Sequence, residues 1–201
     1  MGVIVNPRGT SGSGKTELVR RLLADYGWGR DGRGEPIRRA GRARPIGYRL
    51  RHPRGGRPLL VLGHYEATCG GCDTIRATDG GMGEAFRLAD EHASGGHDVL
   101  LEGLLLSAEH RRSTDLARAH ELHVLRLSTP LDRCVRNVAA RRRAGRGTWA
   151  SIARTAAAHQ AAIEEACRRL RPHAVVEVVG FDAGLRRARE LLGLEEPRAA
   201  A

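Results

Sequence analysis

Lys15 has the surroundings that most directly indicate chemistry, and it is the only lysine in a chain with 34 lysines and arginines. It lies in the octet Gly9-Thr10-Ser11-Gly12-Ser13-Gly14-Lys15-Thr16, which matches the GxxxxGKT pattern of a phosphate-binding loop. In such a loop backbone N–H groups surround phosphates, the lysine reaches the β- and γ-phosphates, and the threonine hydroxyl helps to hold Mg²⁺. A planar guanidinium fits that position poorly, because a compact ammonium is needed to follow a moving phosphoryl group. The octet therefore predicts ATP and Mg²⁺ as ligands, with GTP as the alternative nucleotide.

Two carboxylates follow apolar runs that have the character of buried strands. Glu102 comes directly after the run at residues 99–101, where phosphate-loop proteins place an acid near Mg²⁺ and the attacking group. Asp73 lies in the loop after the run at residues 58–62, on the side where ligands approach an open parallel sheet. Asp73 is the preferred base for an acceptor hydroxyl and Glu102 is its rival. Thr16 and Glu102 are the predicted metal ligands.

The loop at residues 63–75 is expected to face the acceptor, because two adjacent glycines allow a substrate to approach its backbone closely. The substrate-binding residues assigned to this loop are His64, Tyr65, Cys69, Gly70, Gly71, Cys72 and Asp73. Cys69 and Cys72 have the spacing of half a zinc site, but Cys134 and Cys167 stand singly on expected helices. The cysteine pair therefore indicates a shaped loop in preference to a metal centre.

Residues 28–57 hold ten arginines against Asp31 and Glu35, together with many glycines and prolines. This composition interrupts the alternation of strands and helices, so we expect an insertion between the first helix and the second strand, in which Pro45-Ile46-Gly47-Tyr48 resembles short strands or a hairpin. One interpretation is a solvated basic loop. The other is a nucleic-acid surface in which Arg38, Arg44 and Tyr48 bind the substrate, with the tyrosine ring stacking on a base.

Residues 141–149 place arginines between glycines at the end of an expected helix. Such a segment suits a lid that closes over the nucleotide and neutralises charge on the transferring phosphoryl group. Arg142 is assigned the catalytic role and Arg146 a contact with the nucleotide. The alternative is a basic helix end that is favoured by the helix dipole.

These residues lie far apart in the sequence, so they can form one site only if the fold brings their loops to the same edge of a sheet. Apolar runs predict strands at residues 2–6, 58–63, 97–102, 122–128 and 174–179. Helical periodicity predicts helices at residues 15–26, 83–94, 113–119, 131–144, 149–170 and 183–192. Continuous apolar strands alternating with helices are typical of a parallel sheet covered on both faces. The predicted fold class is α/β, a three-layer P-loop kinase fold with a five-stranded parallel sheet. It forms one domain at residues 1–192, followed by a disordered tail at 193–201.

The charge balance limits the class of partner. The formal net charge is +11 and the sequence pI is about 10.9, which indicates a phosphate-rich partner even though arginine-biased coding contributes. The four cysteines follow no secretory leader, and no apolar run approaches the length of a membrane span. We therefore expect reduced thiols, a cytoplasmic location and no membrane partner.

The motifs together resemble the thymidylate-kinase-like P-loop kinases, through the octet, the Glu102 strand and a helix that leads from Thr129-Pro130-Leu131-Asp132-Arg133 into an arginine-rich lid. More narrowly, three segments look like the bacteriophage 5-hydroxymethyluracil DNA kinases: Gly63-His64-Tyr65, Cys69-Gly70-Gly71-Cys72-Asp73-Thr74-Ile75 and Leu101-Glu102-Gly103-Leu104. The resemblance covers about residues 2–180 and implies phosphorylation of the 5-hydroxymethyl group of a modified pyrimidine in DNA, a step in DNA hypermodification. Hydroxymethyluracil and hydroxymethylcytosine both remain open as the base, and a phage origin implies the bacterial host cytoplasm. Thymidylate kinases carry an acid–arginine motif where this chain has Glu102-Gly103, which argues against dTMP as the acceptor.

Two other functions compete with a DNA kinase. A kinase for free nucleosides or nucleotides would carry the basic segment only as a consequence of composition. A regulatory nucleic-acid-binding NTPase would hydrolyse ATP without a phosphorylated product. The DNA kinase is favoured because a small acceptor has no need of a charge of +11, whereas DNA binding gains from counterion release at each phosphate. A base inside a duplex must be extruded, or presented in a single strand, before its 5-substituent meets the γ-phosphate.

Overall fold

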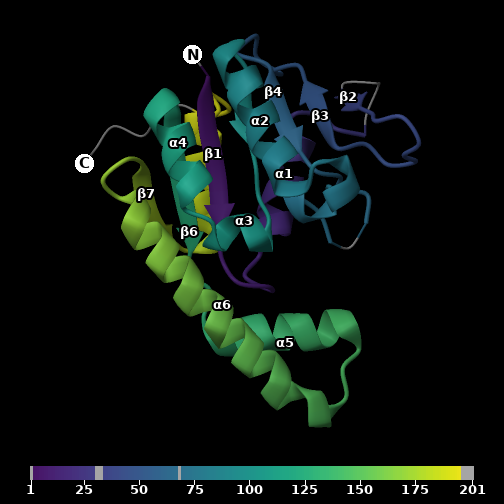
Figure 1. Ribbon diagram of the computed structural model, residues 1–201, viewed down its shortest axis with the longest axis vertical. Coiled ribbons are helices and arrows are strands. Elements are labelled where there is room, and N and C mark those ends of the chain that lie inside the picture. Colours follow the sequence, from purple (N-terminus) through teal and green to yellow (C-terminus); the bar gives the residue numbers. More distant parts are fainter. Residues whose placement is uncertain (1, 30–33, 68, 196–201) are drawn as a thin grey trace.

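The computed structural model describes residues 2–29, 34–67 and 69–195, which form a seven-stranded sheet flanked by helices (Figure 1). The strand order is β2-β3-β4-β5-β1-β6-β7. The strands are β1 (Val3–Arg8), β2 (Gly34–Ile37), β3 (Gly47–Leu50), β4 (Leu59–Leu62), β5 (Asp98–Leu100), β6 (Glu121–Leu127) and β7 (Val175–Val179). β4, β5, β1, β6 and β7 run parallel, so their carboxyl ends meet at one edge of the sheet.

The prediction of five strands is corrected to seven. β2 and β3 come from the arginine-rich segment at residues 28–57 and extend the sheet as an antiparallel hairpin beside β4. β2 is an edge strand whose central residues Glu35 and Pro36 are exposed, so no apolar run marks it in the sequence. A proline is tolerated there because an edge strand need not donate on both sides.

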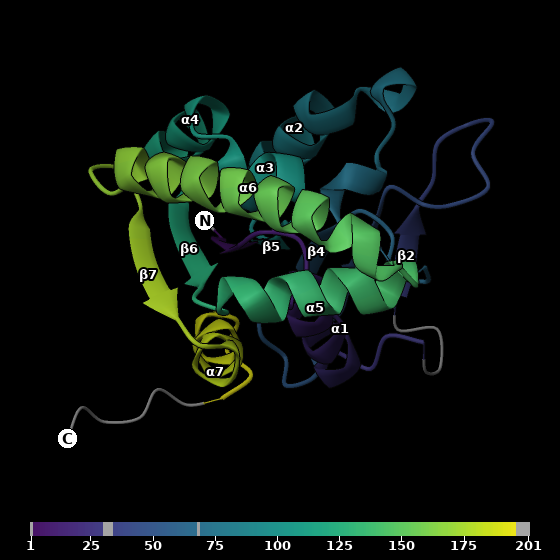
Figure 2. The ribbon, with the colours of Figure 1, turned by 90° about the horizontal axis from the view of Figure 1, so that it is seen from below.

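Helices cover both faces of the sheet, as the view from below shows (Figure 2). The helices are α1 (Lys15–Asp25), α2 (Gly81–Ser94), α3 (Leu104–Ala108), α4 (Arg111–Ala119), α5 (Leu131–Arg142), α6 (Trp149–Leu170) and α7 (Phe181–Leu191). α1 and α7 lie on one face, whereas α2, α3, α4 and α6 lie on the other. Three single-turn 3₁₀ helices occupy loops, at η1 (Cys72–Thr74), η2 (Ala77–Asp79) and η3 (Arg146–Thr148).

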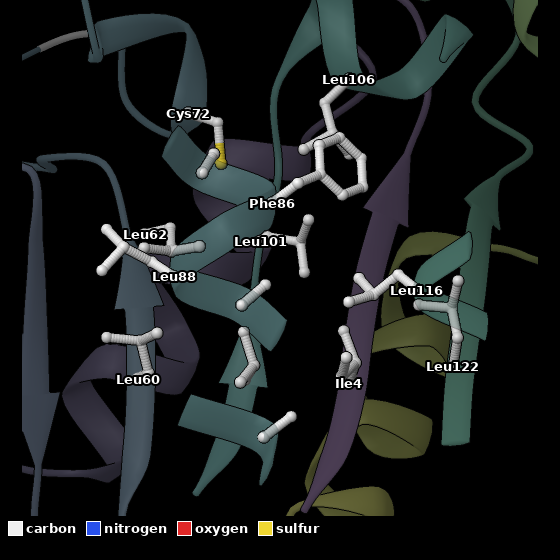
Figure 3. Close-up of a cluster of buried hydrophobic side chains, with 14 of the residues drawn as sticks. Ile4, Leu60, Leu62, Cys72, Phe86, Leu88, Leu101, Leu106, Leu116 and Leu122 are labelled. Atoms are coloured by element: carbon white, nitrogen blue, oxygen red, sulfur yellow. The ribbon is translucent and has the colours of Figure 1, made fainter. Parts of the chain in front are cut away.

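The alternating side chains of the strands form two hydrophobic cores, one on each face. Figure 3 shows the core under α2, where strand residues such as Ile4 and Leu60 meet Phe86 of α2 and Leu106 of α3. The opposite core joins Val5 and other strand residues to the apolar stripes of α1 and α7. Both cores lie behind the carboxyl edge of the sheet and hold its loops in place.

The helices α5 and α6 project beyond the sheet as a hairpin, with its turn distant from the cores (Figure 1). A third, small core joins them, formed by Val135, Val138, Ala139, Ile152 and Ala156. The turn between them contains residues 143–148, so the hairpin includes the segment predicted to act as a lid. At the other end of the chain, Leu194 is buried in the core with α1 and α7, which shows that the described chain stays packed beyond residue 192. Residues 196–201 of the predicted tail lie outside the described residues.

Candidate active site

The phosphate-binding octet connects the end of β1 to the start of α1. The Lys15 ammonium lies 2.7 Å from the carbonyl oxygen of Gly9 and 3.3 Å from that of Thr10. The side chain is buried, and burial lowers the pKa of the amine while the charges of Glu102 and Asp73 oppose this change. The ammonium is therefore held within the curve of the loop, close to where the loop's N–H groups would receive anionic oxygens.

Thr16 and Glu102 lie together at the mouth of this loop. The Thr16 hydroxyl donates to Glu102 Oε1 at 3.1 Å, although the two residues are far apart in the sequence. Glu102 is almost fully buried, and burial raises the pKa of its carboxyl to about 7 against the opposing charge of Lys15. A hydroxyl and a carboxylate are hard oxygen ligands, so this pair suits Mg²⁺.

Asp73 lies at the same site, in the 3₁₀ turn η1 of the loop at residues 63–75, which we call the acceptor loop after its expected role. Its carboxylate accepts the backbone N–H of Leu104 at 2.5 Å and that of Leu105 at 3.2 Å, so it binds the first turn of α3. α3 begins two residues after Glu102, and this bond therefore ties the acceptor loop to the loop that carries Glu102. Asp73 is both a candidate base and a positioning group for the short helix.

One cavity of about 490 Å³ brings these groups together. Its lining combines the predicted residues Lys15, Thr16, Cys69, Gly70, Asp73 and Glu102 with several that the motifs did not single out, among them Arg20, Leu104, Asn137 and Arg141. Arg20 lies on α1 and donates to the carbonyl oxygen of Ala67 in the acceptor loop. The cavity thus lies between the phosphate loop, the acceptor loop and α5.

The lid arginine that lines this cavity is Arg141. The predicted catalytic arginine, Arg142, is exposed on the next position of α5 and is not among the lining residues. Successive helical residues point about 100° apart, and of these two exposed arginines Arg141 is the one that lines the cavity. Arg141 follows Asn137 by one helical turn, and Asn137 donates to the carbonyl oxygen of Gly12 at 2.8 Å. The side chain of Arg146, the predicted nucleotide contact, lies outside the described part of the structure.

Gly71 fixes the acceptor loop against Glu102. It has φ +85°, and a Cβ built there would lie 2.5 Å from both the carbonyl oxygen and Oε1 of Glu102. The next residue, Cys72, donates its backbone N–H to that same carbonyl oxygen at 2.7 Å. Only glycine allows this approach, so Gly71 lets the loop pack closely on Glu102, whereas Gly70 lines the cavity.

Two other residues assigned to substrate have buried side chains. Cys72 points into the core beside Leu62, and burial raises the pKa of its thiol well above the ordinary value (Figure 3). Tyr65 is 2% exposed and packs in the opposite core. Their side chains support the loop from within, whereas the exposed Cys69 lines the cavity.

His64 and Tyr48 belong to a second region around Glu66. The Tyr48 hydroxyl donates to the Glu66 carboxylate, and the buried His64 imidazole lies 3.6 Å from its other oxygen. Burial lowers the pKa of His64, and the charge of Arg44 acts in the same direction. The Trp28 and Tyr48 rings meet edge to face at 5.4 Å beside Glu66, where they line a cavity of about 440 Å³. Arg38 also lines it, so two of the residues assigned to substrate border this cavity, although Tyr48 is only 4% exposed.

The arginines of residues 28–57 divide into two groups. Four form ion pairs: Arg39 with Glu84, Arg42 with Asp79, Arg49 with Glu35 and Arg57 with Asp98. Arg42 also donates to the carbonyl oxygen of Thr74 at 2.5 Å, which anchors the hairpin to the acceptor loop. In the described part of this segment, Arg38, Arg44, Arg51 and Arg54 form no ion pair with a carboxylate. Arg30 and Arg33 lie outside the described residues.

A further cavity of about 500 Å³ opens on the other side of the phosphate loop. It is lined by Ser13 and Gly14 of the loop, by Thr129 and Pro130 after β6, and by Phe181 after β7. The Arg21 guanidinium lies 4.9 Å from the centre of the Phe181 ring. An apolar ring next to a phosphate-binding loop is suited to a purine base.

The described residues contain no cluster of three or more His, Cys, Asp or Glu side chains that could hold a metal ion. Among the helices in the described ranges, none is long and apolar enough to cross a membrane.

Comparison with known proteins shows similarity to a phage enzyme. A 5-hmdU DNA kinase of Pseudomonas phage PaMx11 is 45% identical over 140 residues, which cover 69% of this chain and 69% of that protein. No family model matches the chain.

Proposed function

The chain belongs to the 5-hydroxymethyluracil DNA kinase family, and on this premise we propose that it transfers the γ-phosphate of ATP to the 5-hydroxymethyl group of 5-hydroxymethyluracil in DNA. The product would be a phosphomethyl base, an activated intermediate for hypermodification. Uracil is the base because the phage relative is named for it, whereas the sequence motifs alone left cytosine open. The alternative, a kinase for free nucleosides or nucleotides, is not supported by the name of this relative.

The observation that carries this proposal is the convergence of Lys15, Thr16, Glu102 and Asp73 on one cavity at the carboxyl edge of the parallel sheet. A phosphate-binding ammonium, two oxygen ligands for a divalent cation and a second carboxylate are the groups that phosphoryl transfer to an alcohol requires. The strand order and the octet between β1 and α1 support a P-loop kinase fold in which the β2–β3 hairpin is an insertion.

On the nucleotide side, the octet at residues 9–16 would hold the phosphates, with the base in the cavity lined by Phe181. Thr16 and Glu102 would hold Mg²⁺, which supplies positive charge to the phosphate oxygens when bound. Lys15 would neutralise charge on the phosphoryl group during transfer. Arg141 lines the cavity and is the lid residue best placed to assist, with Arg142 and Arg146 as additional contacts when the hairpin closes.

On the acceptor side, Asp73 would accept the proton of the hydroxymethyl group as its oxygen attacks the γ-phosphorus and the bond to ADP breaks. Glu102 remains the alternative base. Cys69 and Gly70 would border the entering base, because they line the cavity next to Asp73. The exposed Arg38 and Arg44 would bind the flanking DNA. Tyr48, which is only 4% exposed, and the buried His64 would support this surface from beneath through Glu66.

Mass spectrometry of released nucleosides tests the reaction. An oligonucleotide containing 5-hydroxymethyluracil is incubated with ATP and Mg²⁺, and a nucleoside heavier by one phosphate is expected. Matched oligonucleotides with thymine test the need for the hydroxyl, and ones with 5-hydroxymethylcytosine test base choice. Phosphorylation of free 5-hydroxymethyldeoxyuridine but not of the DNA would overturn the proposal in favour of a small-molecule kinase. ATP hydrolysis without a phosphorylated base would indicate the regulatory NTPase.

A further inference from the structure

Leu105 is an exposed apolar side chain at the edge of the catalytic cavity. Its side chain is 67% exposed, the highest value among the large hydrophobic residues that the structure describes. The residue before it, Leu104, lines the cavity, and the backbone N–H of Leu105 is bound to Asp73 Oδ1. The solvent-exposed Leu105 therefore lies directly beside Asp73, the carboxylate proposed to face the acceptor.

The backbone under Leu105 is held at both ends of α3. At its start Asp73 accepts the N–H groups of Leu104 and Leu105. At its end the fully buried Arg8 donates to the carbonyl oxygens of Ser107, at 3.1 Å, and Glu109, at 2.7 Å. Both contacts involve a charged group, which makes them stronger than ordinary hydrogen bonds. The backbone of this short helix is therefore fixed at both ends, which holds the Leu105 side chain in place when it contacts another molecule.

The packing of α3 leaves Leu105 as its outward residue. Leu106 and Ser107 are buried, and Leu106 belongs to the core that Figure 3 shows. Leu104 is partly buried against the same core. Within the run Leu104-Leu105-Leu106, the two flanking side chains stabilise the helix and the central one contributes nothing to the core.

Phosphorylation of a base in duplex DNA requires that the base leave the stack, and an exposed apolar side chain can assist this. Lys15 and Glu102 are buried at the base of the cavity, so a hydroxymethyl group can reach them only if its base leaves the helical stack. Extrusion leaves a gap, and proteins that unstack DNA fill such gaps with apolar side chains, leucine among them. We propose that Leu105 enters the base stack at the position vacated by the extruded 5-hydroxymethyluracil, which makes it a positioning residue for duplex substrates. This inference rests on the proposed function.

The test compares paired and unpaired acceptors. Leu105→Ala is assayed on a duplex with one 5-hydroxymethyluracil opposite adenine and on the same strand alone. We expect kcat/KM to fall at least tenfold on the duplex and to change less than twofold on the single strand. Leu105→Met, which retains an apolar side chain of similar length, should keep most duplex activity. Val178→Ala, which shortens a 44% exposed valine on β7, is the matched control and should leave both substrates unaffected.

A second readout reports the extrusion itself. 2-Aminopurine placed next to the modified base should brighten when the wild-type protein binds the duplex, and the Leu105→Ala variant should lose most of that increase. Equal loss of activity on both substrates, or unchanged duplex activity, would overturn the inference. So would a wild-type enzyme that phosphorylates only single strands. Absence of phosphate transfer to either substrate by the wild type would instead refute the proposed function.

Discussion

The hydroxyl of Thr16 donates to Glu102 Oε1 at 3.1 Å, which joins the phosphate-binding loop to the end of β5. This bond brings two predicted metal ligands into contact. It also places the Glu102 carboxylate, whose pKa burial raises to about 7, beside the buried Lys15 ammonium. The chemistry of the site therefore depends on a small group of coupled charges.

Lys15→Arg should abolish phosphoryl transfer although it conserves the charge. The ammonium fits between the carbonyl oxygens of Gly9 and Thr10, and a guanidinium is too wide for that space. We expect kcat to fall by about 10² or more, by analogy with the loss of a group that stabilises transition-state charge. DNA affinity, measured by fluorescence anisotropy, should change less than twofold. Turnover close to that of the wild type would refute the role of the lysine.

Glu102→Gln should remove one acid-dependent component of stability in the metal-free protein. The folded pKa of Glu102 is about 7 and the unfolded value is about 4.3, so its contribution is fully present below pH 4.3 and is lost as the pH rises through 7. Unfolding by guanidinium chloride in the presence of EDTA, repeated at several pH values, measures the free energy of unfolding of both proteins. Between pH 5 and pH 8 the stability of the wild type relative to the variant should decrease by about 2 kcal/mol. A constant difference would show that the carboxyl titrates normally.

Gly71→Ala should disrupt the site, because an added Cβ would lie 2.5 Å from two oxygens of Glu102 and the residue has φ +85°. We expect a loss of about 2 kcal/mol or more in unfolding free energy, together with loss of activity. Gly83→Ala is the matched control. Gly83 lies within α2 and a Cβ there would meet nothing within 4 Å, so this change should stabilise the protein by about 0.5–1 kcal/mol. If both variants behave alike, the close packing on Glu102 is not a constraint.

Arginines with and without ion-pair partners should respond differently to substitution. Arg44→Ala should weaken DNA binding and lower the slope of log affinity against log salt by about one. Arg49→Ala removes an arginine that is paired with Glu35, so it should have a smaller effect on that slope. Fluorescence anisotropy titrations at salt concentrations from about 50 to about 200 mM give this slope for both variants. Equal slopes for the two variants would contradict a DNA-binding role for Arg44.

The sequence predicts much of the frame because its signals are local. Each parallel strand coincides with an apolar run, and the octet marks the junction between β1 and α1. Residues 45–48 indicated short strands or a hairpin, but the sequence did not show that β2 and β3 join the main sheet, because that pairing depends on β4, which lies beyond the loop that follows them. α3 was also missed, because a five-residue helix is too short to show a periodic pattern.

The candidate site was predicted less completely, for a reason of orientation. Motifs identify residue types, but they do not fix which of two adjacent helical arginines faces a cavity, and Arg141 lines it where Arg142 was assigned. Burial is likewise a tertiary property, so the loop residues Tyr65 and Cys72 looked available to a substrate although both lie in the cores. Arg8, which binds the end of α3, belongs to no motif, so nothing in the sequence indicated its role.

The small core between α5 and α6 has a consequence for how this enzyme could be diversified. Because Val135, Val138 and Ile152 pack among themselves, the outer part of the hairpin is held by its own small core. The inner part is not independent, since Ile163 and Leu170 of α6 belong to the core under α2 and Asn137 of α5 bonds to Gly12 of the phosphate loop. Changes in length or charge at the turn, residues 143–148, could therefore be tolerated without repacking the sheet, whereas changes nearer its base would disturb both the sheet and the phosphate loop.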